Sequence, residues 1–146
     1  MQTLKIKRLH PTVKLPDVAY EGDAGIDLYL SENLALQPGE RKKVPMGIGL
    51  EIPAGAVGLI RERSSKAKDG LKMLGGVLDA GYRGEVFAML LNTSHETLKY
   101  PAGTHVVQLL ILPYLPVRIA EVDTLSPSQR GTQGFGSSDG RHLTRS

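Results

Sequence analysis

The chain has 146 residues, of which 40% are hydrophobic and 23% are charged, and its formal net charge at pH 7 is +3. This balance is typical of one soluble globular domain and argues against a disordered chain. The absence of cysteine excludes disulfide frameworks, thiol catalysis and cysteine-ligated zinc sites. No apolar run is long enough to span a membrane, and residues 1–8 lack the apolar core of a signal peptide. We therefore expect a cytoplasmic protein with no membrane partner.

Short apolar segments separated by proline and glycine turns dominate the chain. Residues 4–7 and 117–122 alternate polar and apolar side chains with a period of two, as strands do. The other predicted strands are runs rich in Val, Ile and Leu that lie beside turn residues. They cover residues 43–52, 57–61, 85–92 and 106–112.

One segment, residues 64–72, is predicted to form a helix. Ser64 is available as its N-cap and Gly70 lies near its end. A single short helix among many strands indicates an all-β sandwich or a barrel-like fold.

The last part of the chain differs in composition from the rest. Residues 126–146 are rich in glycine and serine, with Phe135 and Leu143 as their only large apolar side chains. Such a segment cannot bury enough surface to fold alone. We therefore divide the chain into a β-rich domain over residues 1–125 and a flexible C-terminal arm over residues 126–146, which is either a frayed end or a lid that becomes ordered on an anion.

Polar residues stand at four places inside the apolar, strand-like sequence. Asp27 and Gln108 each interrupt an apolar segment, and a buried amide such as that of Gln108 needs a hydrogen-bond partner. Arg63 precedes two serines at the start of the predicted helix, a combination that either caps the helix or binds phosphate. Asp79 lies between glycine pairs that predict a hairpin through which the backbone approaches another group closely.

In this order, the segments closely resemble the five motifs of the trimeric dUTP pyrophosphatase (dUTPase) family, the deoxyuridine 5'-triphosphate nucleotidohydrolases. The resemblance extends over residues 22–140, and the third motif, with the sequence GVLDAGYRG, is the most specific. The matching segments are residues 24–29, 58–65, 76–84, 103–108 and 130–138.

The resemblance implies a distorted jelly-roll or β-clip-like sandwich that assembles as a homotrimer, with each active site built from three subunits. It also implies hydrolysis of dUTP to dUMP and pyrophosphate with Mg²⁺, by attack of water on the α-phosphate. That reaction limits uracil in DNA and supplies dUMP for dTMP synthesis. The expected partner is therefore dUTP, and no direct binding of nucleic acid is expected.

The matching motifs assign a role to each polar residue. Asp79 matches the catalytic carboxylate that deprotonates the attacking water and contacts the sugar 3′-hydroxyl. Asp27 matches an aspartate near the metal, which it contacts through water because Mg²⁺ keeps several waters and binds mainly substrate phosphates. The residues that match contacts to the phosphate chain are Arg63, Ser64, Ser65 and Gln108.

The hairpin and the C-terminal arm match the parts that read the nucleoside. The backbone of Gly76, Val77, Leu78 and Asp79, with Phe87 opposite, resembles the uracil slot of the family. Tyr82 matches the ring that packs on deoxyribose and excludes a 2′-hydroxyl. In the arm, Phe135 matches a ring that stacks on uracil and Arg130 a contact to the γ-phosphate. The remaining arm positions expected to contact substrate are Gly134, Gly136 and Ser137.

Four positions depart from the family pattern. Glu62 stands where a small residue or proline is usual, and its charge is expected to point away from the phosphates. His105 stands where an arginine is common, so a stabilising contact there is altered. Gln133 and Asp139 change the arm motif.

Two other functions remain open. A dCTP deaminase shares the fold but needs a glutamate near the middle of the strand after the hairpin, where this chain has Met89. A non-catalytic nucleotide-binding regulator would keep the motifs without turnover, although an intact Asp79 and arm argue against it.

Overall fold

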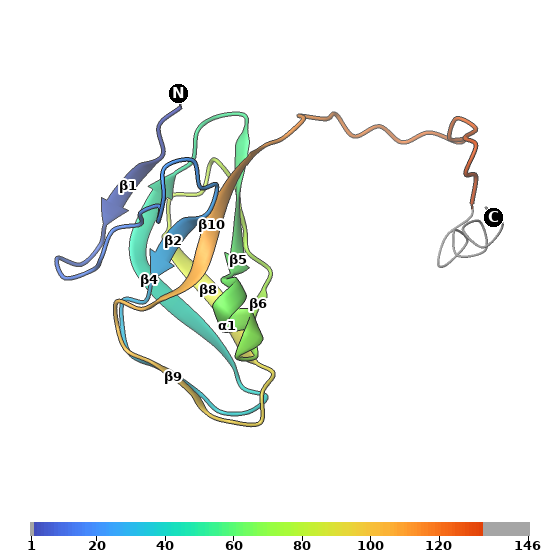
Figure 1. Cartoon of the computed structure of the whole chain (residues 1–146). Helices are drawn as coiled ribbons and strands as arrows, with labels where there is room; N and C mark the ends of the chain where they lie inside the picture. Colours follow the sequence, from blue (N-terminus) through green and yellow to red (C-terminus); the bar gives the residue numbers. More distant parts are fainter. Residues whose placement is uncertain (1, 133–146) are drawn as a thin grey trace. The chain divides into compact units, whose positions relative to one another are not determined.

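The computed structural model describes residues 2–132 (Figure 1). The chain divides into two units, Met1–Pro116 and Val117–Ser146. The predicted arm contacts of Gly134, Phe135, Gly136 and Ser137 lie outside the described residues, as do the departures at Gln133 and Asp139. The predicted domain boundary at residue 125 stays a prediction.

The first unit consists of strands paired in antiparallel order. One four-stranded sheet has the order β1 (Lys5–Arg8), β4 (Arg41–Glu51), β8 (Glu85–Asn92) and β6 (Leu71–Leu74). A second has the order β2 (Ile26–Tyr29), β10 (His105–Pro113), β5 (Ala56–Glu62) and β7 (Val77–Leu78). A two-stranded ribbon pairs β3 (Leu34–Leu36) with β9 (Leu98–Tyr100).

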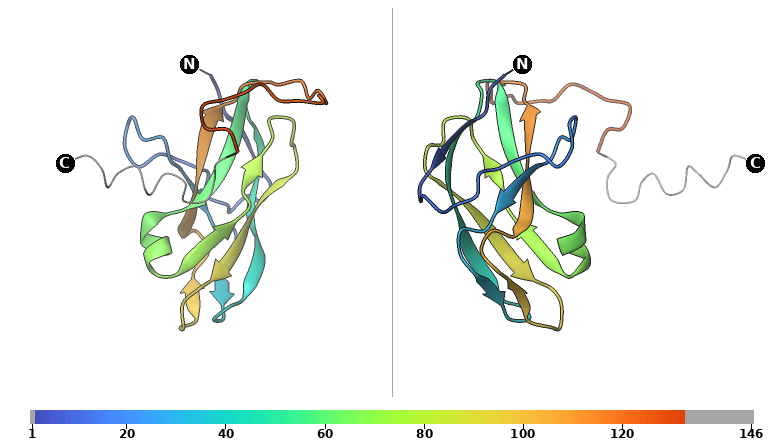
Figure 2. Two further views of the ribbon diagram at one scale, coloured as in Figure 1. Left: turned by 90° about the vertical axis from the view of Figure 1, so that its right-hand side faces the viewer. Right: turned by 60° about the vertical axis from the view of Figure 1, so that its left-hand side comes forward.

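The two larger sheets pack face to face, as the two turned views show (Figure 2). Alternate side chains of each strand point inward, so both sheets contribute to one buried cluster. Its fully buried members include Leu28, Ile60 and Leu109 from the second sheet and Val44, Val86 and Leu90 from the first. The predicted all-β, jelly-roll-like sandwich with one short helix is confirmed.

Most predicted strands are present, with ends that differ by one or two residues. Residues 85–92 coincide with β8, while 43–52 correspond to β4 and 106–112 to β10. The strand predicted for residues 117–122 is wrong, because no strand is assigned there. Its apolar side chains are exposed, Ile119 by 95% and Val117 by 77%. Alternation alone does not form a strand where the described chain provides no pairing partner.

The single helix of residues 2–132, α1 (Ser64–Lys68), is shorter than predicted. It ends because Gly70 adopts a φ of 94°, after which Leu71 begins β6. The predicted serine cap is wrong: Arg63 occupies the N-cap position, and no side chain caps the helix. Within the described residues, no helix is long and apolar enough to cross a membrane.

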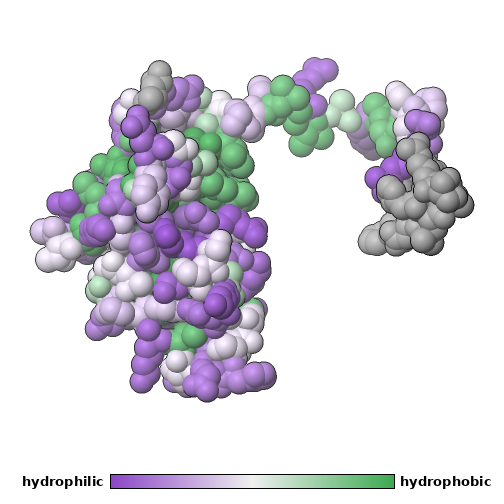
Figure 3. All heavy atoms as spheres, in the orientation of Figure 1, coloured by the Kyte–Doolittle hydropathy of each residue, from purple (hydrophilic) through white to green (hydrophobic). Residues whose placement is uncertain are grey.

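The outer face of the second sheet is apolar. Leu59 pairs with Leu110 on one side and with Val77 on the other, while Val57 pairs with Leu112. Paired residues share a face, so these five side chains form one surface, which we call the apolar sheet face. Val77 is 65% and Leu112 is 41% exposed. Hydrophobic surface is visible near the upper ends of β5 and β10 (Figure 3).

Candidate functional site

The predicted hairpin forms one wall of a pocket of about 210 Å³, which we call the hairpin pocket. Gly76 makes this hairpin possible: its carbonyl accepts a hydrogen bond of 2.7 Å from the Ile60 N–H, and a Cβ on it would lie 2.5 Å from the Ile60 carbonyl oxygen. Any side chain there would push β7 away from β5. The residues that line the pocket are Val77, Leu78, Asp79, Tyr82, Glu85 and Phe87.

Asp79 and Tyr82 are exposed residues of the pocket lining. The Asp79 side chain is exposed, and its backbone carbonyl accepts a hydrogen bond of 3.0 Å from the Tyr82 N–H. The Tyr82 hydroxyl donates to the Glu85 carbonyl at 2.8 Å. The pocket thus brings together Phe87 and all of the predicted hairpin residues except Gly76, which does not line it. Glu85 also lines the pocket and was not predicted from the sequence.

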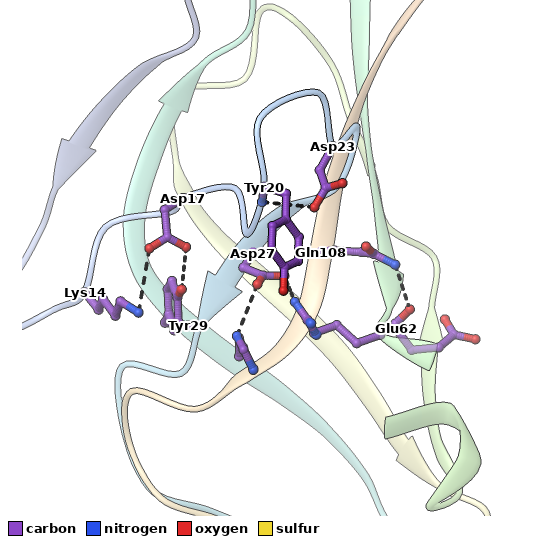
Figure 4. Close-up of polar contacts among 10 residues, drawn as sticks. Lys14, Asp17, Tyr20, Asp23, Asp27, Tyr29, Glu62 and Gln108 are labelled. Atoms are coloured by element: carbon purple, nitrogen blue, oxygen red, sulfur yellow. Dashed lines mark hydrogen bonds and ion pairs between the residues drawn. The ribbon is translucent and has the colours of Figure 1, made fainter. Parts of the chain in front are cut away.

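A second pocket, of about 270 Å³, is lined by two of the predicted phosphate-binding residues, Arg63 and Gln108, and is called the arginine pocket here. Asp27 on β2 is only 4% exposed, and its Oδ1 accepts a hydrogen bond from Nη1 of Arg63 (Figure 4). Gln108 pairs in register with Asp27 and donates to the Glu62 carbonyl at 3.4 Å. The lining residues are Ala19, Asp23, Ala24, Gly25, Asp27, Arg63 and Gln108.

Gly25 connects the first and fourth motifs in space. A Cβ on Gly25 would lie 2.4 Å from Oε1 of Gln108, so the amide can lie against the backbone only because no side chain is present. Gln108 is half-buried rather than buried, and it has the partner that a strand amide requires.

His105 makes the second close approach to Asp27, with Nδ1 3.1 Å from Oδ2. Burial and the nearby cations Arg63, Lys14 and Lys66 lower the pKa of the His105 imidazole below 6.5. The ring is therefore mainly neutral at pH 7, and a proton on Nδ1 allows it to donate to the carboxylate.

Tyr29 and Asp17 form a second set of contacts beside His105. The Tyr29 ring stacks on the imidazole, and the Tyr29 hydroxyl donates to Asp17 at 2.5 Å. Tyr29 could have been found from the sequence, since it lies two residues from Asp27 on the same strand face. Asp17 could not, because only folding brings it beside β2, where its carbonyl accepts from the Asp27 N–H.

The remaining predicted contacts are not brought into these pockets. Ser64 and Ser65 are exposed at the start of α1 and line neither the hairpin pocket nor the arginine pocket. Arg130 belongs to the second unit, where it is exposed. Their roles stay predictions.

Glu62 is directed away from the arginine pocket. Its carboxylate pairs with Lys72 of β6 at 2.7 Å and lies 3.9 Å from Arg61, and Figure 4 shows it turned away from Asp27. The expectation that its charge points away from the arginine pocket is met.

The Glu62–Lys72 pair makes the fold more sensitive to acid. Burial alone raises the pKa of Glu62, but the Lys72 hydrogen bond and the Arg61 charge lower it overall, below 4.5. The stabilisation is therefore complete above pH 4.5 and is lost as the pH falls through the lower pKa of the folded state. In thermal melts at pH 7, the free energy of unfolding of wild type should exceed that of E62Q by up to about 1 kcal/mol. In strong acid the two should be equally stable. A difference that persists in acid would contradict this role; E21Q, at an exposed site, is the control.

The hairpin pocket and the arginine pocket lie far apart within one chain. They share no lining residue, and β2 and β7 form opposite edges of the same sheet. Along β5, Gly58 pairs with Leu78 just before Asp79, whereas Arg63 follows the other end of the strand. The five residue steps from Gly58 to Arg63 correspond to roughly 16 Å along an extended strand.

The fold is an antiparallel β-sandwich that carries two separate pockets, and the comparisons with known proteins identify its family. The sequence model of the dUTPase family matches residues 12–139. The chain therefore belongs to the dUTPase family, as its motifs predict.

Relatives match over nearly the whole chain. The deoxyuridine 5'-triphosphate nucleotidohydrolase of Clostridium tetani is 42% identical over 92% of this chain and 95% of its own. That of Thermobifida fusca is 43% identical over 94% of this chain and 79% of its own. Among solved structures, the dUTPase of Staphylococcus bacteriophage 80alpha with dUPNHPP has a TM-score of 0.84 and 28% identity, over 94% of this chain and 99% of that one.

Proposed function

We propose that this chain is a dUTP diphosphatase, which hydrolyses dUTP to dUMP and pyrophosphate. The observation that carries the proposal is the combination of an exposed carboxylate in the lining of the hairpin pocket with a guanidinium anchored on a buried carboxylate. The exposed carboxylate of Asp79 can activate water beside a bound nucleobase, and the guanidinium of Arg63 can hold phosphate. The relatives named deoxyuridine 5'-triphosphate nucleotidohydrolase support the same assignment.

In the proposed reaction, Asp79 orients a water molecule and accepts its proton. The water oxygen forms a bond to the α-phosphorus, and the bond from that phosphorus to the α,β-bridging oxygen breaks, so that the electron pair leaves with pyrophosphate. Arg63 and Gln108 donate hydrogen bonds to the phosphate oxygens on which negative charge develops. Ser64 and Ser65, exposed at the start of α1, add contacts to the same chain of phosphates.

The hairpin pocket is proposed to select deoxyuridine. Backbone groups from Gly76 to Asp79 are fixed by the β5–β7 pairing, so they present a constant pattern of donors and acceptors to a pyrimidine edge. Phe87 forms the opposite wall, and Tyr82 packs on the sugar at the mouth of the pocket.

The arginine pocket fits Mg²⁺ that is carried by the triphosphate. Both oxygens of Asp27 already have neighbours, Arg63 on one and His105 on the other. Asp27 is therefore suited to an outer contact through water rather than to direct ligation. When bound, the metal neutralises phosphate charge and aligns the triphosphate.

We further propose that the protein is a homotrimer with shared active sites. Water activation and charge stabilisation must meet at one phosphorus atom, within a few ångströms of each other, whereas Asp79 and Arg63 are separated along β5 within one chain. A second copy packed on the apolar sheet face would cover Leu59, Leu110 and Val77.

The C-terminal arm is proposed to complete each site. Its expected contacts to substrate are Arg130, Gly134, Phe135, Gly136 and Ser137. We also propose a cytoplasmic location, where the dUTP pool is accessible.

The direct test is release of pyrophosphate from dUTP, dCTP, dTTP and UTP, each with Mg²⁺ and with excess chelator. We expect release from dUTP alone, dependent on the metal. Ammonia released from dCTP would instead favour the deaminase, and binding of dUTP without any product would favour a regulator.

A further inference from the structure

We propose that His105 is a positioning residue, which holds Asp27 and thereby aims the Arg63 guanidinium at the phosphates. This inference rests on the proposed function of the arginine pocket. It concerns a residue that the motif assignments leave without a role.

The side chain of Asp27 is only 5% exposed. A buried carboxylate is stable only if both of its oxygens have donors, because an unpaired buried charge is costly. Arg63 serves Oδ1, and His105 Nδ1, at 3.1 Å, is placed to serve Oδ2. Without the imidazole, the carboxylate can rotate about its last bond and draw Arg63 with it.

The side chain of Arg63 is 27% exposed. A free arginine side chain has about 2 kcal/mol of rotamer entropy, much of which is lost when it binds a phosphate in one orientation. The hydrogen bond to Asp27 uses one of its five donors and fixes the direction of the others. The orientation of Asp27 therefore determines how well Arg63 is prepared for substrate.

His105 faces Asp27 because of an irregularity in β10. With regular alternation, His105 would point into the core together with Val107 and Leu109. A register shift between His105 and Val107 changes this: Val106 is buried as well, and His105 turns to the face that carries Asp27. The β-bulge thus directs the imidazole toward the arginine pocket.

The His105 imidazole is also restrained on the side where the Tyr29 ring stacks on it. The Tyr29 ring lies 5.7 Å from it, centroid to centroid, at an interplanar angle of 25°. Tyr29 is itself fixed by its hydrogen bond to Asp17 and by Lys14, whose Nζ lies 3.8 Å from the ring centroid. These contacts restrict the ring rotation that would take Nδ1 away from Asp27.

The test compares two substitutions that divide the functions of the imidazole. H105F keeps a ring for the stack on Tyr29 but removes Nδ1, and H105N keeps an N–H donor near the Nδ1 position but removes the ring. We expect H105F to lower kcat/KM for dUTP, and affinity for dUpNHpp, by about tenfold, with H105N within about threefold of wild type. Affinity for dUMP, which lacks the outer phosphates, should change in neither. H95F, at another exposed histidine, is the matched control.

The outcomes separate the inference from the function on which it rests. Unchanged dUpNHpp affinity in H105F would overturn the positioning role. Equal loss of dUMP and dUpNHpp affinity together with a lower Tm would also overturn it, since that pattern indicates general destabilisation. A wild-type protein that binds dUpNHpp but releases no pyrophosphate from dUTP would refute the proposed function, while the affinities would still decide the role of His105.

Discussion

Replacement of Asp79 by asparagine is expected to lower kcat for dUTP by about a thousandfold, because general-base catalysis contributes on the order of 10² to 10⁴ to rate. The amide keeps the shape of the carboxylate but cannot accept the proton from water. The Asp79 side chain is exposed, and the turn is maintained by its backbone carbonyl rather than by its carboxylate. Pyrophosphate release should therefore collapse while Tm and affinity for dUpNHpp stay close to wild type.

Retained turnover in D79N would contradict the role of Asp79 as the general base. If D79N retains turnover, the base lies elsewhere, and Glu85 becomes the next candidate because it lines the same pocket. The E21Q substitution, at an exposed acid that lines neither pocket, controls for a general effect of removing negative charge.

Replacement of Arg63 by alanine should reduce both stability and activity. It leaves the buried Asp27 carboxylate without its partner on Oδ1, and the loss of one member of a buried ion pair typically costs about 3–5 kcal/mol. Hydrolysis of dUTP should fall by roughly a hundredfold or more, because a donor to the charged phosphates is lost. Urea unfolding and pyrophosphate release measure the two effects.

A double substitution separates these effects. In R63A/D27N, the neutral amide no longer requires a cation, so much of the lost stability should return while hydrolysis stays as low as in R63A. Return of activity together with stability would mean that Arg63 acts only through the fold. If R63A alone is as stable as wild type, the carboxylate has found another donor and the buried pair is not the stabilising element.

The strands that carry the motifs could be predicted because each is a short apolar run bounded by turn residues. The helix α1 ends before the predicted residue 72, because Gly70 adopts a positive φ and β6 pairs with β8. Residues 117–122 show the opposite limit: their alternation suits a strand, but a strand exists only with a partner.

The candidate site was predicted as a set of residue types rather than as a geometry. Asp27, Arg63 and Gln108 were found, and the register of β2, β10 and β5 explains their proximity. The contact of His105 with Asp27 could not be predicted, because it depends on a β-bulge that reverses the alternation of one strand. Asp17 likewise acquires its place only on folding, through a backbone bridge to Asp27 and the hydrogen bond from Tyr29.

The separation of the hairpin pocket from the arginine pocket also has a genetic consequence. In a trimer with shared sites, a chain that lacks the carboxylate of Asp79 still carries a sound arginine pocket, and a chain altered at Arg63 still carries a sound hairpin. Subunits of the two kinds, each inactive alone, would assemble some sites from two intact halves when refolded together. Two loss-of-function alleles of such a gene would complement each other. One defective allele expressed in excess would have a dominant-negative effect, because its subunits would enter trimers with the wild-type subunits.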